Sequence, residues 1–128
     1  MKILIVDDEE MIREVIKEYS EDAGYQTDEA ENGKIALEKI NKNTYDLLIL
    51  DIMMPEMDGF TVLKNIPKEK MIPTIVLSAR GEEYDKLNGF DLGIDDYLTK
   101  PFSPKELIAR IKAVLNRTQK NLPTLYRY

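Results

Sequence analysis

Four apolar residues run directly into carboxylates twice in this sequence, as ILIVDD at residues 3–8 and as LLILD at residues 47–51. Continuous apolar runs of this length are typical of parallel strands that are buried on both faces of a sheet. The carboxyl ends of parallel strands meet along one edge, where open α/β sheets bind their ligands. The two segments therefore predict that Asp7, Asp8 and Asp51 lie close together.

Further apolar segments complete a pattern in which strands alternate with amphipathic segments. The expected strands cover residues 3–6, 25–30, 45–50, 74–77 and 96–99. Buried strands joined by crossover helices form a doubly wound sheet. We therefore expect an α/β fold with five parallel strands in the order 2-1-3-4-5 and helices on both faces, the flavodoxin-like arrangement.

The expected helices have apolar faces and recognisable end signals. The apolar face of the first helix comprises Met11, Ile12, Val15, Ile16 and Tyr19, and Gly24 ends it. Further helices are expected after Asn32, before Pro67 and over residues 82–92. The last helix begins with the capping box Ser103-Pro104-Lys105-Glu106 and buries Leu107, Ile108, Ile111, Val114 and Leu115. The apolar pattern ends at Arg117, so we expect one domain over residues 1–117 and the start of an interdomain linker over residues 118–128.

The composition limits the chemistry that the chain can perform. It has 128 residues, no His, no Cys and a formal net charge of -6 at pH 7. Without these residue types there can be no disulfide, zinc–thiolate site, Cys nucleophile or Ser–His triad. The acidic balance argues against nucleic-acid binding by this domain itself, because phosphate backbones are bound by basic faces. No segment approaches the ~20 apolar residues of a membrane span, so we expect a cytoplasmic protein without membrane contact.

The ends of the other strands add a hydroxyl and an amine to the three carboxylates. Ser78 follows the fourth strand and Lys100 follows the fifth. This set of groups suits a hard cation and a phosphoryl group better than a soft metal. A cis peptide bond between Lys100 and Pro101 would direct the lysine side chain toward the carboxylates.

Four motifs at these strand ends resemble the receiver domain of two-component response regulators. They are Val6-Asp7-Asp8, DIMMPEMDG at residues 51–59, Ser78-Ala79 and Lys100-Pro101-Phe102, and the similarity covers about residues 2–117. The resemblance implies that Asp51 accepts a phosphoryl group from a sensor histidine kinase. It also implies that Asp7 and Asp8 help to bind Mg²⁺, with Mn²⁺ as an alternative ion.

The same resemblance implies that Ser78 and Lys100 contact the phosphoryl oxygens and that Tyr97 acts as a conformational switch. The chemistry needs no general base, because a carboxylate can attack phosphorus directly. Metal ligands would come from Asp8, Asp51 and the backbone carbonyl of Met53, with Asp7 acting through a water molecule.

The charges of three carboxylates, a divalent metal and Lys100 cancel before phosphorylation, so the site can accept one more negative charge. Met53 and Arg80 lie two residues after the acceptor and the hydroxyl, and neither can activate water. We therefore expect slow self-dephosphorylation, and a signalling protein in place of an enzyme.

The segment from residue 86 to 117 resembles more specifically the OmpR/PhoB subfamily of winged-helix transcription factors. The resemblance rests on GIDDYLTKPF at residues 93–102 and ELIARI at residues 106–111, with Ile94 in place of the more usual Ala. It implies that phosphorylation drives homodimerisation through Lys86, Asp91, Asp95, Asp96, Glu106, Arg110, Lys112 and Arg117. A two-fold interface of this kind needs both signs of charge on one face. DNA would be bound only by a C-terminal output domain that these residues do not include.

Other functions remain as alternatives. A stand-alone, single-domain receiver would act by docking on a protein partner. An Asp-nucleophile phosphohydrolase shares the fold but needs a second Asp where this sequence has Met53. A flavin-binding electron carrier needs a phosphate-cradling loop where this sequence has Asp7 and Asp8.

Overall fold

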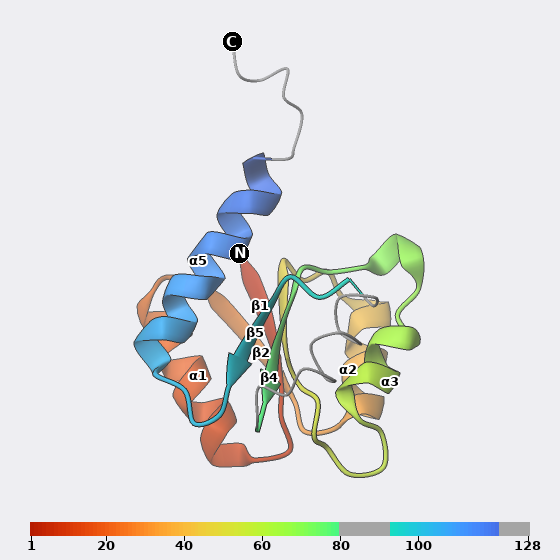
Figure 1. Cartoon of the computed structure of the whole chain (residues 1–128). Coiled ribbons are helices and arrows are strands. Elements are labelled where there is room, and N and C mark those ends of the chain that lie inside the picture. Colours follow the sequence, from red (N-terminus) through yellow and green to blue (C-terminus); the bar gives the residue numbers. More distant parts are fainter. Residues whose placement is uncertain (80–92, 121–128) are drawn as a thin grey trace.

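A computed structural model describes residues 1–79 and 93–120, and its centre is a five-stranded parallel sheet (Figure 1). The strand order is β2-β1-β3-β4-β5, as the sequence predicts. The strands are β1 (Lys2–Val6), β2 (Gln26–Ala30), β3 (Leu47–Asp51), β4 (Thr74–Ser78) and β5 (Asp96–Thr99). The first and third strands are therefore neighbours at the centre of the sheet, where the order of the chain reverses.

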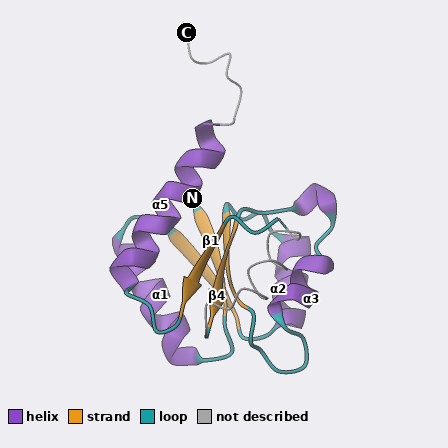
Figure 2. Cartoon of the chain, viewed as in Figure 1, coloured by secondary structure: helices purple, strands orange, loops and turns teal. Residues whose placement is uncertain are grey.

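Helices cover both faces of the sheet (Figure 2). They are α1 (Glu10–Asp22), α2 (Gly33–Lys42), α3 (Gly59–Lys64), the 3-10 helix η1 (Lys68–Lys70) and α5 (Pro104–Lys120). Helices α1 and α5 lie on one face, and α2 and α3 lie on the other. The helix expected over residues 82–92 lies outside the described residues. None of the helices in residues 1–79 and 93–120 has both the length and the apolarity that a bilayer crossing requires.

The two faces of the sheet explain why the middle positions of the central strands are continuously apolar. In β1, Ile3 and Ile5 pack against the side chains of α1 and α5, whereas Leu4 and Val6 pack against those of α2 and α3. All four side chains are fully buried. Successive residues of a strand point to opposite faces, so covering both faces removes the need for polar residues.

The predicted apolar face of α1 is partly wrong. Ile12 and Ile16 pack against the core, but Met11 is 79 % exposed and Val15 and Tyr19 are each 38 % exposed. The buried line of the helix instead continues from Ile12 and Ile16 to Ser20. Positions separated by four residues form one line along a helix. Two apolar lines lie side by side on α1, and only one of them faces the sheet.

Three predicted helix ends are confirmed by their backbone contacts. Gly24 follows the end of α1 and has a φ of +98°. This backbone conformation favours glycine, because glycine has no Cβ. The Asn32 side chain accepts a hydrogen bond from the Ile35 N–H at 2.8 Å at the start of α2. Ser103 Oγ accepts one from the Glu106 N–H at 3.3 Å at the start of α5. Local sequence signals thus mark where α1 ends and where α2 and α5 begin.

Helix α5 is longer than the sequence suggests, because it continues past Arg117 to Lys120. Thr118 Oγ1 donates a hydrogen bond to the Leu115 carbonyl at 2.9 Å within the helix. The final turns extend beyond the sheet in Figure 1, where no apolar stripe is needed. Apolar periodicity marks only the part of a helix that packs against the core. The helix end predicted from that periodicity, at Arg117, is therefore too early.

Candidate functional site

The three carboxylates predicted to converge do so at the carboxyl edge of the sheet. One oxygen from each of Asp7, Asp8 and Asp51 lies within 4.8 Å of the others. The register explains this placement, because Val6 of β1 pairs with Leu50 of β3 and the next residue of each strand is an aspartate. Asp7 and Asp51 are buried, whereas Asp8 is exposed.

Lys100 enters the same cluster from the end of β5. Its Nζ lies 2.9 Å from Asp7 Oδ2 and 3.4 Å from Asp51 Oδ2. A third carboxylate, that of Glu9, lies 3.5 Å away. The Lys100 N–H also donates to the Ser78 carbonyl at 2.6 Å, and the Lys100–Pro101 peptide bond is cis as predicted. One ammonium group therefore forms ion pairs with carboxylates at the ends of two different strands, β1 and β3.

Each buried carboxylate is also fixed by a backbone N–H group two residues later. The Met53 N–H donates to Asp51 Oδ1 at 3.0 Å, and the Glu9 N–H donates to Asp7 Oδ1 at 2.9 Å. This is the Asx-turn arrangement, in which a side chain takes the place of a backbone acceptor. In both residues the other oxygen faces Lys100. The carboxylates are held in place before any ligand binds.

The electrostatics of the cluster favour a further positive charge. Burial raises the pKa of Asp51, and the neighbouring Asp7 carboxylate adds to that effect, although the Met53 N–H and Lys100 oppose it. Burial likewise raises the pKa of Asp7 against the hydrogen bonds from Glu9 and Lys100. Burial alone would lower the pKa of Lys100, but Asp7 and Asp51 outweigh it and leave that pKa raised. The negative charges are thus incompletely compensated, as expected of a site that binds a cation.

The loop after Asp51 depends on a glycine that the sequence analysis quoted only as part of a motif. A Cβ atom on Gly59 would lie 2.7 Å from Ile52 Cα and 2.8 Å from the Asp51 carbonyl oxygen. The Gly59 N–H donates to the Ile52 carbonyl at 3.2 Å. Backbone lies on the other side of each contact and cannot move aside easily. Gly59 therefore lets α3 start directly against the strand end that carries Asp51.

Ser78 and Tyr97 lie where the sequence places them, on the two strands beyond β3. Ser78 is the last residue of β4 and is buried, and its strand neighbour Leu77 pairs with Asp51. Tyr97 of β5 is partly buried and packs against the core cluster beneath α2 and α3. Their roles as phosphoryl contact and switch stay predictions.

The residues expected at a dimer interface already make contacts within this chain. Arg110 Nη1 lies 2.9 Å from both carboxylate oxygens of Asp96, and Arg110 Nη2 lies 3.1 Å from Glu106 Oε2. Arg117 Nη2 donates to the Asp95 carbonyl at 3.3 Å, and Lys112 is exposed. The predicted interface residues Lys86 and Asp91 lie outside the described residues. The described part of the face thus carries both signs of charge, as a two-fold contact requires.

Glu9 and Arg13 are not predicted from the sequence, although both touch the cluster. Glu9 shares Lys100 with the two buried aspartates, and Arg13 Nη1 donates to the Asp7 carbonyl oxygen at 2.6 Å. Arg13 belongs to the polar side of an amphipathic helix, and Glu9 directly precedes that helix. The only sequence signal that points to Glu9 and Arg13 is that both lie within six residues of Asp7, just after a strand end.

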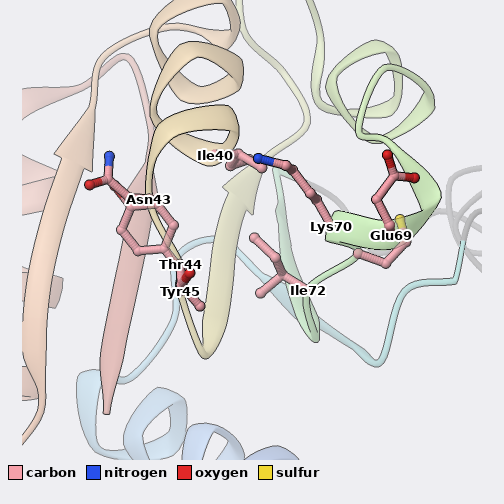
Figure 3. Close-up of a pocket in the computed structure, with 8 residues that line it drawn as sticks. Ile40, Asn43, Thr44, Tyr45, Glu69, Lys70 and Ile72 are labelled. Atoms are coloured by element: carbon pink, nitrogen blue, oxygen red, sulfur yellow. The ribbon is translucent and has the colours of Figure 1, made fainter.

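A hollow lies at the other end of the strands, where β3 and β4 begin (Figure 3). It has a volume of about 190 Å³ and is lined by residues that precede β3 and β4, among them Tyr45 and Ile72. Lys70 beside it donates to the Asn41 carbonyl at 2.6 Å, near the end of α2. The acid cluster lies at the other ends of these strands, so this hollow takes no part in its chemistry.

Comparisons with known proteins agree on one family. The model of the response regulator receiver domain family matches residues 3–112. The chain is 48 % identical over 118 residues to the transcriptional regulatory protein SrrA of Staphylococcus aureus, an alignment that covers 92 % of this chain and 49 % of SrrA. The chain therefore spans about half the length of the curated relatives it matches.

Solved structures show the same fold. The receiver domain of the Francisella response regulator 1452 is 44 % identical with a TM-score of 0.84, and the match covers 91 % of this chain and 98 % of that one. The response regulator TrrA of Thermotoga maritima, solved in complex with Mg²⁺ and BeF, is 40 % identical with a TM-score of 0.78. That match covers 88 % of this chain and 97 % of TrrA.

Proposed function

The chain belongs to the response regulator receiver domain family of two-component signalling, and we propose that Asp51 is its phosphoryl acceptor and a sensor histidine kinase its donor. The observation that carries this proposal is the placement of Asp51. It ends the central strand β3, buried, between the Met53 N–H and the Lys100 ammonium, with Asp7 and Asp8 beside it. The resemblance stated from the sequence implies the same residue, and the family match supports that resemblance.

Asp51 acts as the nucleophile. One carboxylate oxygen forms a new bond to phosphorus, while the bond from phosphorus to the donor's imidazole nitrogen breaks and that nitrogen keeps the electron pair. A carboxylate whose pKa is raised by burial is a better nucleophile than an exposed one. Lys100 and the Ser78 hydroxyl would contact the phosphoryl oxygens, so catalysis would consist of positioning and charge stabilisation.

The cluster fits a divalent cation. Two oxygens on the same Mg²⁺ lie at most roughly 4.2 Å apart, twice the usual Mg–O distance of about 2.1 Å. The three carboxylate oxygens lie within 4.8 Å of one another, which is close to that limit. Asp8, Asp51 and the Met53 carbonyl would hold the ion, with Asp7 acting through water. When bound, the ion supplies positive charge beside the transferred group.

A docking surface for the kinase lies directly beside Lys100. A cavity of about 360 Å³ separates the start of α1 from the loop between β5 and α5. Its apolar lining includes Ile12, Val15 and Phe102. The exposed Met11 continues this apolar surface along α1. An apolar patch beside the open edge of a buried acceptor suits a protein donor, because the donor must cover the site while its own side chain reaches Asp51.

Phosphorylation is proposed to select a conformation in which Ser78 and Tyr97 have moved and the face of β5 and α5 dimerises. A phosphoryl group can shift this equilibrium only through contacts that differ between the two states. The output is proposed to be transcription regulation through a DNA-binding domain, and the relative SrrA is likewise named a transcriptional regulatory protein. Phosphoryl transfer from a sensor kinase and transcription regulation both imply a cytoplasmic location.

The test uses a small phosphodonor. Wild-type protein and Asp51→Asn are incubated with acetyl phosphate and Mg²⁺, and intact masses are compared. One phosphoryl addition should occur in the wild type and none in the variant. Equal addition in both proteins would contradict the assignment of Asp51.

A further inference from the structure

In addition to the Glu9 N–H, three different parts of the fold hold Asp7. Its N–H donates to the Ala30 carbonyl of β2 at 3.2 Å, and its side chain contacts Lys100 at 2.9 Å. Its carbonyl oxygen accepts a hydrogen bond of 2.6 Å from Arg13 Nη1 of α1. The last contact is the one that fixes the peptide plane between Asp7 and Asp8.

Arg13 is itself locked in place. Its Nε lies 3.0 Å from Glu29 Oε1 of β2, and its side chain is only 12 % exposed. Nε and Nη1 belong to one rigid planar group, so the two partners fix its orientation together. Lys17, one turn further along α1, lies 3.7 Å from the other oxygen of Glu29. The guanidinium thus connects β2 to the backbone at the end of β1.

The orientation of the Asp8 side chain depends on the contact between Arg13 and the Asp7 carbonyl more than that of the Asp7 side chain does. The Asp7 carboxylate is bound by Glu9 and Lys100, whereas within residues 1–79 and 93–120 no hydrogen bond or ion pair holds the Asp8 side chain. The direction of an unbound, exposed carboxylate is set by its own backbone. That backbone follows directly from the carbonyl that Arg13 binds.

We infer that Arg13, oriented by Glu29, is a positioning residue for the cation-binding group of Asp8. The inference rests on the proposed function of the acid cluster and adds a residue that acts on it from outside. Residues that orient metal ligands in this way typically change metal affinity by about 10–100-fold when they are replaced. Arg13 would do so through a backbone carbonyl, without touching the ion.

Electrostatics and positioning predict opposite results, which makes the inference testable. Arg13 and Lys17 both carry a positive charge beside Glu29, near a cation site. Removing a positive charge should strengthen cation binding if charge alone matters. Removing the Arg13 contact should weaken binding if that contact orients Asp8.

The experiment compares wild type, Arg13→Met and the matched control Lys17→Met by Mg²⁺ titration, followed through backbone amide chemical shifts. The same spectra show whether each variant is folded. Arg13→Met should raise the Mg²⁺ Kd about tenfold. Lys17→Met should stay within about twofold of wild type, because an exposed charge is screened.

Equal or tighter Mg²⁺ binding by Arg13→Met would overturn the inference while leaving the proposed function intact. A wild type that binds no Mg²⁺ would instead contradict the proposed function itself. If Arg13→Met does not fold, Arg13→Lys takes its place, since it keeps the charge but cannot contact both Asp7 and Glu29. A wild-type Kd in Arg13→Lys would then overturn the inference.

Discussion

Lys100 Nζ lies 2.9 Å from Asp7 Oδ2, although 93 positions separate the two residues in the sequence. The pair joins the end of the central strand β1 to the end of the edge strand β5, and Asp51 lies 3.4 Å from the same nitrogen. Because the lysine is largely buried and both aspartates are fully or almost fully so, this contact compensates charge that water cannot reach.

Lys100→Met should therefore destabilise the metal-free protein. The substitution leaves two buried carboxylates without their shared cation, and we expect the free energy of unfolding to fall by about 2 kcal/mol. Lys105→Met, at an exposed position of α5, serves as the control and should have almost no effect. Urea denaturation in the presence of a chelator measures both. Equal midpoints for the two variants would show that Lys100 does not stabilise the resting cluster.

Two serine substitutions should change stability in opposite directions. Ser20 is fully buried, and its Oγ is the one buried side-chain oxygen or nitrogen without a hydrogen-bond partner in the described parts of the chain. Ser20→Ala should therefore stabilise the protein by about 1 kcal/mol, because it removes an unsatisfied hydroxyl and improves helix propensity. Ser103→Ala removes a helix cap and should cost about 1 kcal/mol. Thermal melts of both variants test the pair, and a loss of stability in Ser20→Ala would show that its hydroxyl has a stabilising partner.

The contact between Asp28 and Tyr45 should give stability a defined pH dependence. Burial alone would raise the pKa of Asp28, but the Tyr45 hydroxyl at 2.6 Å, Lys39 and the Glu29 N–H hold it below its usual value. A lowered carboxyl pKa gives stability that is present above the usual value near 4 and is lost as pH falls. Burial and the Asp28 carboxylate raise the pKa of Tyr45, so its contribution is present below its usual value near 10 and is lost as pH rises.

Tyr45→Phe removes this hydroxyl and should lower the free energy of unfolding by about 1–2 kcal/mol at pH 7. The difference from wild type should shrink below about pH 4 and above about pH 10, where the pair loses its favourable charge state. Urea midpoints measured across this range provide the test. A difference that stays constant from pH 3 to about pH 11 would mean that only packing changes.

Dimerisation of the phosphorylated domain should depend on Arg110 and weaken with salt. Arg110 pairs with Asp96 and Glu106 within this chain, and the proposed interface exchanges such pairs between subunits. Arg110→Glu should abolish the dimer but leave the monomer folded, because exposed ion pairs contribute only about 0–1 kcal/mol each. Lys105→Glu on the same helix makes an equal charge change outside the proposed set. Sedimentation of the phosphorylated proteins at low and high salt decides the matter, and a dimer of wild-type strength in Arg110→Glu would exclude the proposed face.

The sequence predicted those parts of the site that follow from strand ends. Asp7, Asp8, Asp51 and Lys100 each follow an apolar run or end one, and parallel topology brings such ends together whatever the details of packing. Arg13 could not be predicted in this way. Its contact with the Asp7 carbonyl depends on the angle at which α1 leaves the sheet, which an amphipathic pattern does not contain.

The errors on the helices have a similar origin. On α1, Met11, Val15 and Tyr19 form an apolar line as regular as the buried one, so periodicity alone could not tell which line faces the sheet. Val15 of that exposed line also lines the proposed kinase surface. Apolar residues that bind a partner and apolar residues that pack in the core follow the same helical spacing. On α5, the residues from 118 to 120 continue the helix, whose end extends beyond the sheet in Figure 1.

The most direct test of the account is to locate the phosphoryl group itself. Borohydride reduces an aspartyl phosphate to homoserine, so reduction after treatment with acetyl phosphate and Mg²⁺ marks the acceptor permanently. Peptide mass spectrometry should then find homoserine at position 51, only when the phosphodonor is present and with a large loss when the metal is chelated. Homoserine at position 7 or 8 with an unmodified Asp51, or no homoserine at all, would contradict the account.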